Sequence, residues 1–147
     1  MRSYNGARTL AGNRITDYQI WPGDNSMRFL IVDDSSTMRR IIINTLNKLG
    51  YEDVTEAGNG REGLDRLGSG AVDIIITDWN MPEMTGIEFV RSLRGSSVTK
   101  NIPVLMVTTN AAKDDIVEAL KVGVNSYVVK PFTTETMREK IEAVLAR

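Results

Sequence analysis

Two adjacent carboxylates, Asp33 and Asp34, follow an apolar run in the segment LIVDDSS at residues 30–36. At about 4 Å two like charges repel each other by ~1 kcal/mol in water and by ~4 kcal/mol at the effective dielectric near a protein surface. A pair of acidic residues at the end of a buried segment therefore needs a positive charge nearby that offsets this repulsion.

Polar side chains also stand at the ends of three other apolar runs. Asp78 follows DIIIT, Thr108 follows PVLMV, and Lys130 ends SYVVK. Taken singly, an acidic residue in such a place is most often a helix cap or a solvated loop residue. Taken together, these oxygen groups suit a small divalent cation, for which Mg²⁺ is the natural candidate. A metal that keeps some of its waters has room for phosphate oxygens, and a lysine adds positive charge for the same anion.

These side chains can meet only if the segments that carry them are neighbours in one sheet. From Met27 onward, short apolar runs alternate with segments of helical period, and several runs contain no polar residue, which is typical of strands covered on both faces. The runs are FLIV at 29–32, DVTEA at 53–57, DIIIT at 73–77, PVLMV at 103–107 and SYVVK at 126–130. The pattern predicts an α/β fold, a doubly wound sheet of five parallel strands with five helices, whose site lies at the carboxyl ends of the strands.

Apolar stripes at helical spacing indicate the five helices. In the first, Ser35 or Ser36 can cap the start, Ile41 belongs to the stripe, and Gly50 can end it; in the fourth, the stripe includes Leu120. The stripes lie around residues 38–49, 60–67, 86–94, 116–120 and 137–145.

The composition excludes several classes of chemistry. The chain has 147 residues, of which 41% are hydrophobic, a length that suits one domain. Cysteine and histidine are absent, which excludes disulfides, thiolate nucleophiles, the usual zinc sites and triads that need histidine. With 18 basic against 19 acidic residues, we expect neither nucleic acid nor a membrane surface as a partner. No window approaches a transmembrane span or a signal peptide, so we expect a cytoplasmic protein.

The chain divides at Met27. Residues 1–26 have no sustained apolar period and end in the turn-forming cluster PGDNS. We expect an N-terminal extension that is flexible or derives from cloning or an early start codon; a docking arm is the functional alternative. Residues 27–147 form the predicted domain.

Four separated motifs then identify a family. LIVDDSSTMRR, DWNMPEMTG, PVLMVTT and SYVVKPF, in this order, resemble the receiver domain of two-component response regulators, and most of all the single-domain chemotaxis regulators that signal to the flagellar motor. The resemblance covers residues 27–147 and implies the flavodoxin-like strand order 2-1-3-4-5 that is known for this family. It also implies a cis peptide bond between Lys130 and Pro131.

Carried over residue by residue, the resemblance assigns the metal site and the acceptor. It implies that Asp78 is the phosphoacceptor, which forms an acyl phosphate. It implies that Asp34 and Asp78 bind Mg²⁺ directly, together with the backbone carbonyl of Asn80, and that Asp33 acts through a bound water. Phosphoryl transfer needs mainly in-line approach and charge neutralisation, which metal and lysine provide.

The resemblance also assigns a switch. Thr108 would hydrogen-bond the phosphoryl oxygens, Lys130 would pair with them, and Tyr127 would turn inward when the Thr108 hydroxyl moves. A half-buried strand tyrosine with its hydroxyl in water is the alternative for Tyr127. Asn80 and Asn110 stand at positions that tune dephosphorylation. Chemotaxis regulators often carry glutamate where Asn110 stands, and Thr109 is bulkier than the small residue usual at its position.

The implied function is a stand-alone response regulator that catalyses no external reaction and promotes only its own phosphorylation and dephosphorylation. A histidine kinase would be the phosphodonor, the flagellar motor switch protein the binding partner, and a phosphatase a further partner, without a DNA-binding effector. A phosphate sink and a phosphorelay intermediate, neither of which binds the motor, are the alternatives.

Three competing functions fit the sequence less well. Gly58, Gly60 and Gly63 match the spacing G-x-G-x-x-G of dinucleotide sites, but too little chain follows for both halves of that fold, and we interpret NG as a turn into the second helix. A phosphatase with an aspartate nucleophile needs a second aspartate where Asn80 stands. Flavin binding needs a phosphate loop without the acidic pair.

Overall fold

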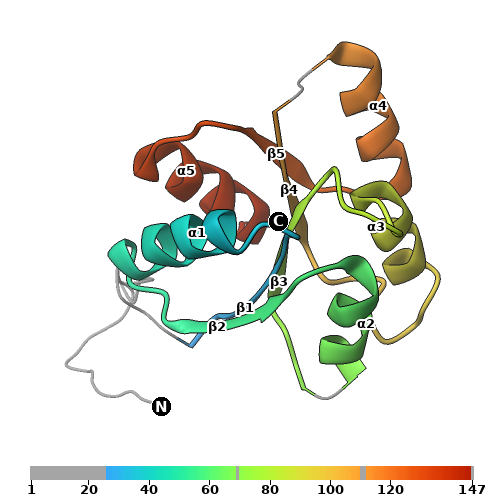
Figure 1. Cartoon of the computed structure of the whole chain (residues 1–147), viewed down its shortest axis with the longest axis horizontal. Helices are drawn as coiled ribbons and strands as arrows, with labels where there is room; N and C mark the ends of the chain where they lie inside the picture. Colours follow the sequence, from blue (N-terminus) through green and yellow to red (C-terminus); the bar gives the residue numbers. More distant parts are fainter. Residues whose placement is uncertain (1–25, 69, 110–111, 147) are drawn as a thin grey trace.

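The sheet explains why so many apolar runs lack polar residues. The computed structural model describes residues 26–68, 70–109 and 112–146. Its five parallel strands have the order β2-β1-β3-β4-β5, which confirms the predicted fold and strand order (Figure 1). All five residues of β3 and of β4 are buried. The strands are β1 (Arg28–Val32), β2 (Asp53–Ala57), β3 (Ile74–Asp78), β4 (Val104–Thr108) and β5 (Ser126–Val129).

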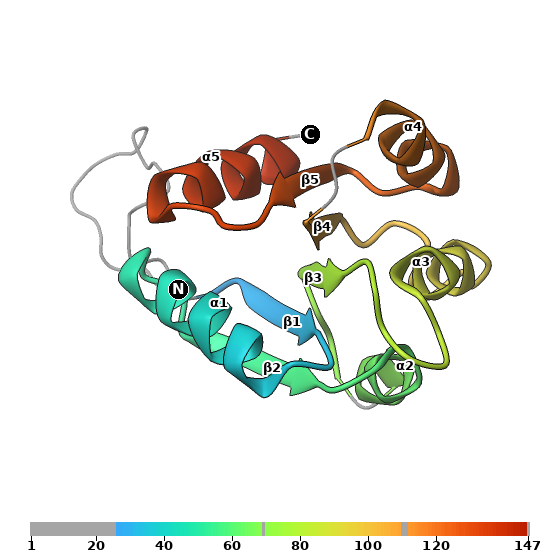
Figure 2. The same ribbon diagram turned by 45° about the horizontal axis from the view of Figure 1, so that its top comes forward.

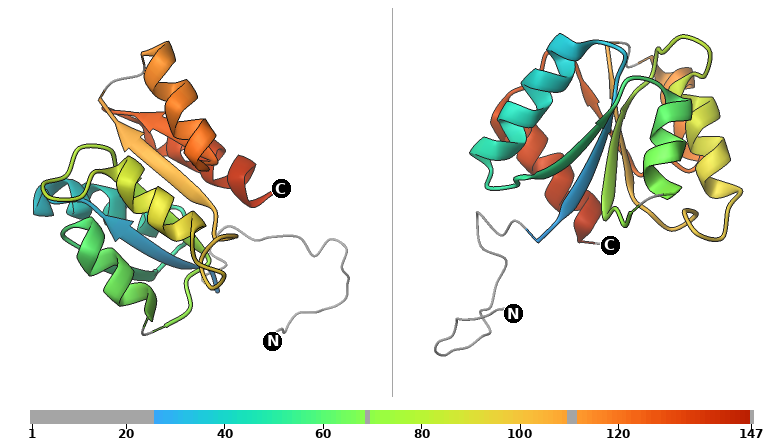
Figure 3. Two further views of the ribbon diagram at one scale, coloured as in Figure 1. Left: turned by 90° about the vertical axis from the view of Figure 1, so that its right-hand side faces the viewer. Right: turned by 60° about the horizontal axis from the view of Figure 1, so that its bottom comes forward.

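The helices cover both faces of the sheet in two groups. α1 and α5 lie on one face, and α2, α3 and α4 lie on the other (Figure 2). A further pair of views shows the sheet between the two groups (Figure 3). The helices are α1 (Ser36–Lys48), α2 (Gly60–Gly68), α3 (Gly86–Arg94), α4 (Lys113–Val122) and α5 (Thr134–Leu145).

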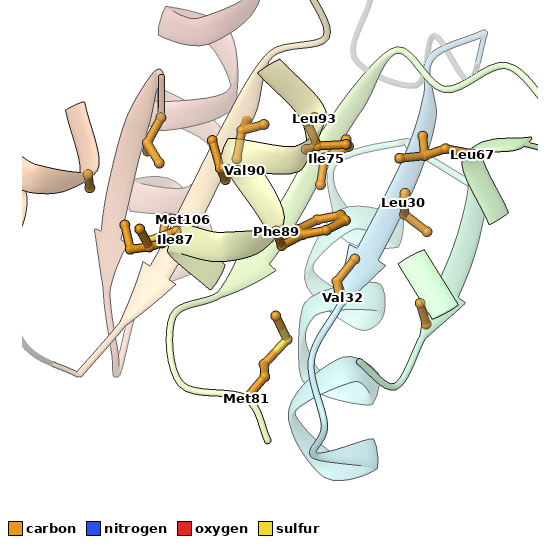
Figure 4. Packing of buried hydrophobic residues seen from close by; sticks show 14 residues of the cluster. Leu30, Val32, Leu67, Ile75, Met81, Ile87, Phe89, Val90, Leu93 and Met106 are labelled. Carbon is orange, nitrogen blue, oxygen red and sulfur yellow. The ribbon is translucent and has the colours of Figure 1, made fainter. Parts of the chain in front are cut away.

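Each face has its own apolar core because successive strand residues point to opposite faces. Leu30 and Val32 of β1 belong to the core under α2 and α3, where Phe89 of α3 lies near Val32 (Figure 4). Phe29 and Ile31 belong to the core under α1 and α5. The strand run is therefore apolar throughout because both of its faces are buried.

The predicted start of α1 is confirmed, and two stripe residues were assigned wrongly. Ser35 caps α1, its side chain accepting from the Met38 N–H. Ile41 is 43% exposed and Leu120 50% exposed, although both were predicted to face the core. Each helix contacts the sheet along one side only, and the neighbouring residue, Ile42 in α1 and Ala119 in α4, occupies that side.

The glycines of the GNGREG segment serve packing. A Cβ atom on Gly60 would lie 2.6 Å from the Met84 sulfur, and one on Gly63 would lie 3.1 Å from the Phe89 ring. α2 begins at Gly60, which confirms the interpretation of NG as the turn into the second helix. These glycines let α2 approach α3 and the loop before it.

A further glycine, Gly86, lets α3 approach the end of β3. Gly86 donates its N–H to the Trp79 carbonyl at 2.8 Å, and a Cβ atom on Gly86 would lie 2.3 Å from the Asp78 carbonyl oxygen. Thr85 and Glu88 form a reciprocal capping box at the start of this helix. Glycine at position 86 therefore helps to place the loop that follows Asp78.

Arg94 connects three segments at the end of the sheet that lies opposite the carboxyl ends of the strands. Its guanidinium donates to the carbonyls of Gly123 at 2.8 Å, Ile102 at 2.8 Å and Lys100 at 3.0 Å. It also donates to the Asn125 side chain at 3.1 Å. One side chain thus joins the end of α3, the loop before β4 and the loop before β5.

Two further expectations concern the ends and surface of the chain. The expected extension lies, for residues 1–25, outside the described residues. Among the residues that the structure describes, no helix has the length and apolar character that crossing a membrane requires.

Candidate functional site

The strand order brings the predicted site residues to one edge of the sheet. Asp33 and Asp34 follow β1, Asp78 ends β3, Thr108 ends β4, and Lys130 follows β5. Because β1, β3, β4 and β5 are consecutive neighbours and parallel, their carboxyl ends lie side by side. Residues that are up to 97 positions apart thus share one site, as the sequence predicted.

The three aspartates form a compact cluster. Asp33, Asp34 and Asp78 each offer one carboxylate oxygen, and these oxygens lie within 4.8 Å of one another. Asp33 is 1% and Asp78 8% exposed, whereas Asp34 is exposed. The cluster is thus buried on one side and open to solvent on the other, which is the arrangement that a metal with remaining water ligands requires.

Lys130 supplies the ammonium group that faces this cluster. Its Nζ lies 3.1 Å from Asp78 Oδ1 and 3.7 Å from Asp33 Oδ2. The Lys130 backbone N–H also donates to the Thr108 carbonyl at 2.7 Å, which anchors the residue to β4. One ammonium group offsets only one of the three carboxylate charges, so the cluster can accept a divalent cation.

The hydrogen bonding of the Asp33 carboxylate tests whether these residues fit a metal ion. Its Oδ1 accepts from the Ser35 N–H at 2.8 Å, while its buried Oδ2 has no hydrogen-bond partner among the described residues. Burial raises the pKa of Asp33 above its ordinary value; the Ser35 N–H lowers this pKa, and the Asp78 charge raises it further. A bound cation, directly or through a water, would satisfy the free oxygen, so the residues present fit Mg²⁺.

Comparison with known proteins decides the family. The sequence profile of the response regulator receiver domain matches residues 29–142. The chain belongs to the response regulator receiver domain family. It is 54% identical over 120 residues to the chemotaxis protein CheY1 of Helicobacter pylori, covering 81% of this chain and 97% of that protein. It is 53% identical over 121 residues to the chemotaxis protein CheY of Pseudomonas aeruginosa, covering 82% of this chain and 98% of that protein.

Solved structures agree with this assignment. The chemotaxis response regulator CheY4 of Vibrio cholerae superposes with a TM-score of 0.75 at 41% sequence identity, covering 80% of this chain and 98% of that chain. The receiver fold, with its sheet order and helix placement, is therefore shown by sequence and by structure together.

The remaining predicted residues of this receiver domain take up different places. Thr108 is buried at the end of β4, and its partner on β5 is Val129. Tyr127, two residues before Val129, is partly buried and lies opposite Met106. The Lys140 ammonium of α5 lies 5.0 Å from the centre of the Tyr127 ring.

Three polar residues of the site loops complete the predicted set. Asn80 is exposed in the loop after β3, and Thr109 is exposed directly after β4. Asn110 lies outside the described residues. The peptide bond between Lys130 and Pro131 is cis, as the family resemblance implied.

Sequence reasoning missed one residue of the receiver site. Arg39 of α1 donates from Nη1 to the Asp33 carbonyl at 2.6 Å and from Nε to Glu56 Oε1 at 2.8 Å. The sequence places Arg39 on the first helix, but its contact with Glu56 depends on the pairing of β1 with β2. Only the tertiary structure reveals that pairing.

Proposed function

We propose that this receiver domain is a chemotaxis response regulator, phosphorylated on Asp78 by a histidine kinase, and that phosphorylation switches a surface that binds the flagellar motor switch protein. The observation that carries the proposal is the convergence of three carboxylate oxygens within 4.8 Å, with the Lys130 ammonium 3.1 Å from Asp78. The names of the relatives, which are chemotaxis proteins, support the choice of pathway. A cytoplasmic location follows from this role.

Mg²⁺ would be held by Asp34, by Asp78 and by the backbone carbonyl of Asn80, with Asp33 acting through a bound water. The free, buried Oδ2 of Asp33 and the surplus of negative charge in the cluster support this assignment. When bound, the ion neutralises the phosphoryl oxygens and the acceptor carboxylate, which otherwise repel each other.

The residues of this chain would perform the remaining work. A carboxylate oxygen of Asp78 forms a bond to phosphorus while the bond from phosphorus to the donor's histidine nitrogen breaks, and that nitrogen keeps the electron pair. Lys130, which pairs with Asp78 before transfer, pairs with a phosphoryl oxygen afterwards. The Thr108 hydroxyl donates to another phosphoryl oxygen. A carboxylate nucleophile carries no proton that a general base would have to remove.

The switch would connect Thr108 to the surface formed by α4, β5 and α5. When the Thr108 hydroxyl moves toward the phosphoryl group, Tyr127 gains room to turn inward. The exposed apolar side chains of this surface support a role in binding, since Val117, Leu120 and Val129 are 41%, 50% and 38% exposed. α4 and α5 flank β5 in the fold (Figure 2).

Asn80 and Asn110 would tune the lifetime of the acyl phosphate, and a phosphatase would be a further partner. The exposure of Asn80, two residues after Asp78, supports this role. A phosphate sink or a phosphorelay intermediate would share the same chemistry. Phosphorylation-dependent binding to the purified motor switch protein separates the proposed regulator from both.

The first test is the intact mass of the full chain after incubation with acetyl phosphate, with and without Mg²⁺. We expect one phosphoryl adduct that requires Mg²⁺ and is absent from Asp78→Asn. Asp65→Asn, an exposed change of the same kind on α2, serves as the control and retains the adduct. An adduct that persists in Asp78→Asn would place the acceptor elsewhere.

A further inference from the structure

We infer that Arg39 is a positioning residue for the metal site: its guanidinium, oriented by Glu56, holds the peptide unit between Asp33 and Asp34 and thereby aims both carboxylates. The inference deepens the proposed function and rests on it. Arg39 touches no reacting group; it acts through the backbone that carries the two aspartates.

The contacts of Asp33 show how fully this backbone is held. Its N–H donates to the Ala57 carbonyl of β2 at 3.1 Å, and its carbonyl accepts from Arg39 Nη1 at 2.6 Å. Its Oδ1 accepts from the Ser35 N–H at 2.8 Å. Among the described residues, the polar atom of Asp33 that remains without a hydrogen bond is Oδ2, the oxygen 3.7 Å from the Lys130 ammonium.

The peptide bond transmits this restraint to the second aspartate. The Asp33 carbonyl and the Asp34 N–H belong to one planar unit, so a hydrogen bond to the carbonyl also orients the Cα of Asp34. Asp34 is exposed and begins a loop that leads into α1. Arg39, anchored in the first turns of α1, therefore ties the loop to the helix that follows it.

The geometry explains why arginine stands here. Nη1 and Nε are two nitrogens of one rigid plane, and they donate to acceptors from two strands, the Asp33 carbonyl after β1 and Glu56 Oε1 on β2. Lysine carries one nitrogen on a flexible stem and does not present this fork. The Arg39 side chain is only 19% exposed, which limits its alternatives.

Electrostatic repulsion alone predicts a change in Mg²⁺ affinity opposite to the one that positioning predicts. A guanidinium beside the site repels a second cation, so removing Arg39 would strengthen Mg²⁺ binding if electrostatics dominated. Positioning predicts weaker binding after the same change. Glu56→Gln separates the two further, because glutamine keeps the Oε1 acceptor for Nε and loses only the negative charge.

The experiment is a titration of the full chain with MgCl₂, in which binding is measured from the two-dimensional amide NMR spectrum. Arg39→Gln and Arg39→Lys should each raise the Kd for Mg²⁺ about tenfold, as loss of a hydrogen bond behind a metal ligand commonly does. Both should shift the Ser35 amide signal before any metal is added. Arg40→Gln, at an exposed neighbour with the same charge change, should keep the wild-type Kd, and Glu56→Gln, which retains the Oε1 acceptor, should raise the Kd less than Arg39→Gln does.

The outcomes separate the two levels of inference. If the wild-type chain does not bind Mg²⁺, the proposed function fails. If it binds Mg²⁺ and Arg39→Gln binds as tightly or more tightly, only the role of Arg39 is overturned. If Glu56→Gln binds Mg²⁺ more weakly and Arg39→Lys binds it as the wild type does, charge explains the change in Kd. That result would also overturn the positioning role of Arg39. The same spectra show whether each variant is folded.

Discussion

The Lys130 ammonium donates to Asp78 Oδ1 across 3.1 Å, although the two residues are 52 positions apart in the chain. The same ammonium lies 3.7 Å from Asp33 Oδ2, so it bridges carboxylates at the ends of two different strands. This ammonium restrains the Asp78 carboxylate and offsets part of the negative charge that a metal ion would otherwise balance.

Replacing Lys130 by methionine should strengthen Mg²⁺ binding and slow phosphorylation. Removal of one positive charge from the cluster should lower the Kd for Mg²⁺ by about tenfold, equivalent to ~1.4 kcal/mol. The rate of adduct formation with acetyl phosphate should fall by ~10²-fold, because the proposed function assigns Lys130 to stabilise the transferring phosphoryl group. Amide NMR titration and intact mass measure the two effects. Lys100→Met, exposed at the other end of β4, should change neither, and weaker Mg²⁺ binding by Lys130→Met would contradict the charge argument.

Gly86→Ala should lower the free energy of unfolding and disturb the loop that follows Asp78. The added Cβ would lie 2.3 Å from the Asp78 carbonyl oxygen, so the backbone must shift, at a cost of roughly 2 kcal/mol or more in the free energy of unfolding. Urea unfolding measures this cost. Gly95→Ala is the matched control, since the nearest atom to its Cβ would be 3.6 Å away, and it should leave stability unchanged or slightly raised. Equal stability of the two variants would show that the loop relaxes freely.

Arg94→Lys should lower the free energy of unfolding by about 3 kcal/mol. Lysine keeps the charge but leaves several of the acceptors at Gly123, Ile102 and Asn125 without their donor. Thermal and urea unfolding measure the loss, with Arg91→Lys, exposed on the same helix, as the control. Since this cluster lies at the opposite edge of the sheet from Asp78, Mg²⁺ binding should be retained at temperatures where the variant is folded. A variant as stable as the control would show that water replaces these hydrogen bonds.

Asp73→Asn should lower stability at neutral pH and have little effect in acid. The Arg28 guanidinium and N–H donate to Asp73 Oδ2 and hold the pKa of that carboxyl below its ordinary value. A carboxyl whose pKa is lowered in the folded state stabilises the fold at pH values above its unfolded pKa of about 4. This contribution is lost as the pH falls through the folded pKa. Thermal unfolding at pH 7 and at pH 3 measures the difference between variant and wild type. A difference that persists undiminished at pH 3 would assign it to packing, and Asp53→Asn, exposed at the start of β2, controls for a charge change at this edge.

Local patterns were sufficient for much of the fold. The unbroken apolar runs of β3 and β4 predicted strands buried on both faces, because only such strands need no polar side. Ser35 was predicted correctly as a helix boundary, since a cap is a local property of the chain. The prediction that Ile41 and Leu120 face the core was wrong, because helical periodicity does not define how much of the helix surface the neighbouring elements cover.

The sequence by itself determined which residues could form the site and at which edge of the sheet they would stand. Asp33, Asp34, Asp78, Thr108 and Lys130 each end or follow a strand, and parallel strands place their carboxyl ends together. The tertiary structure alone decided the contacts within that edge: which oxygen of Asp33 is left free, which carboxylates share Lys130, and that Arg39 reaches both Asp33 and Glu56. These contacts join residues far apart in the chain, and their distances depend on strand register and helix packing, which no local pattern of residues encodes.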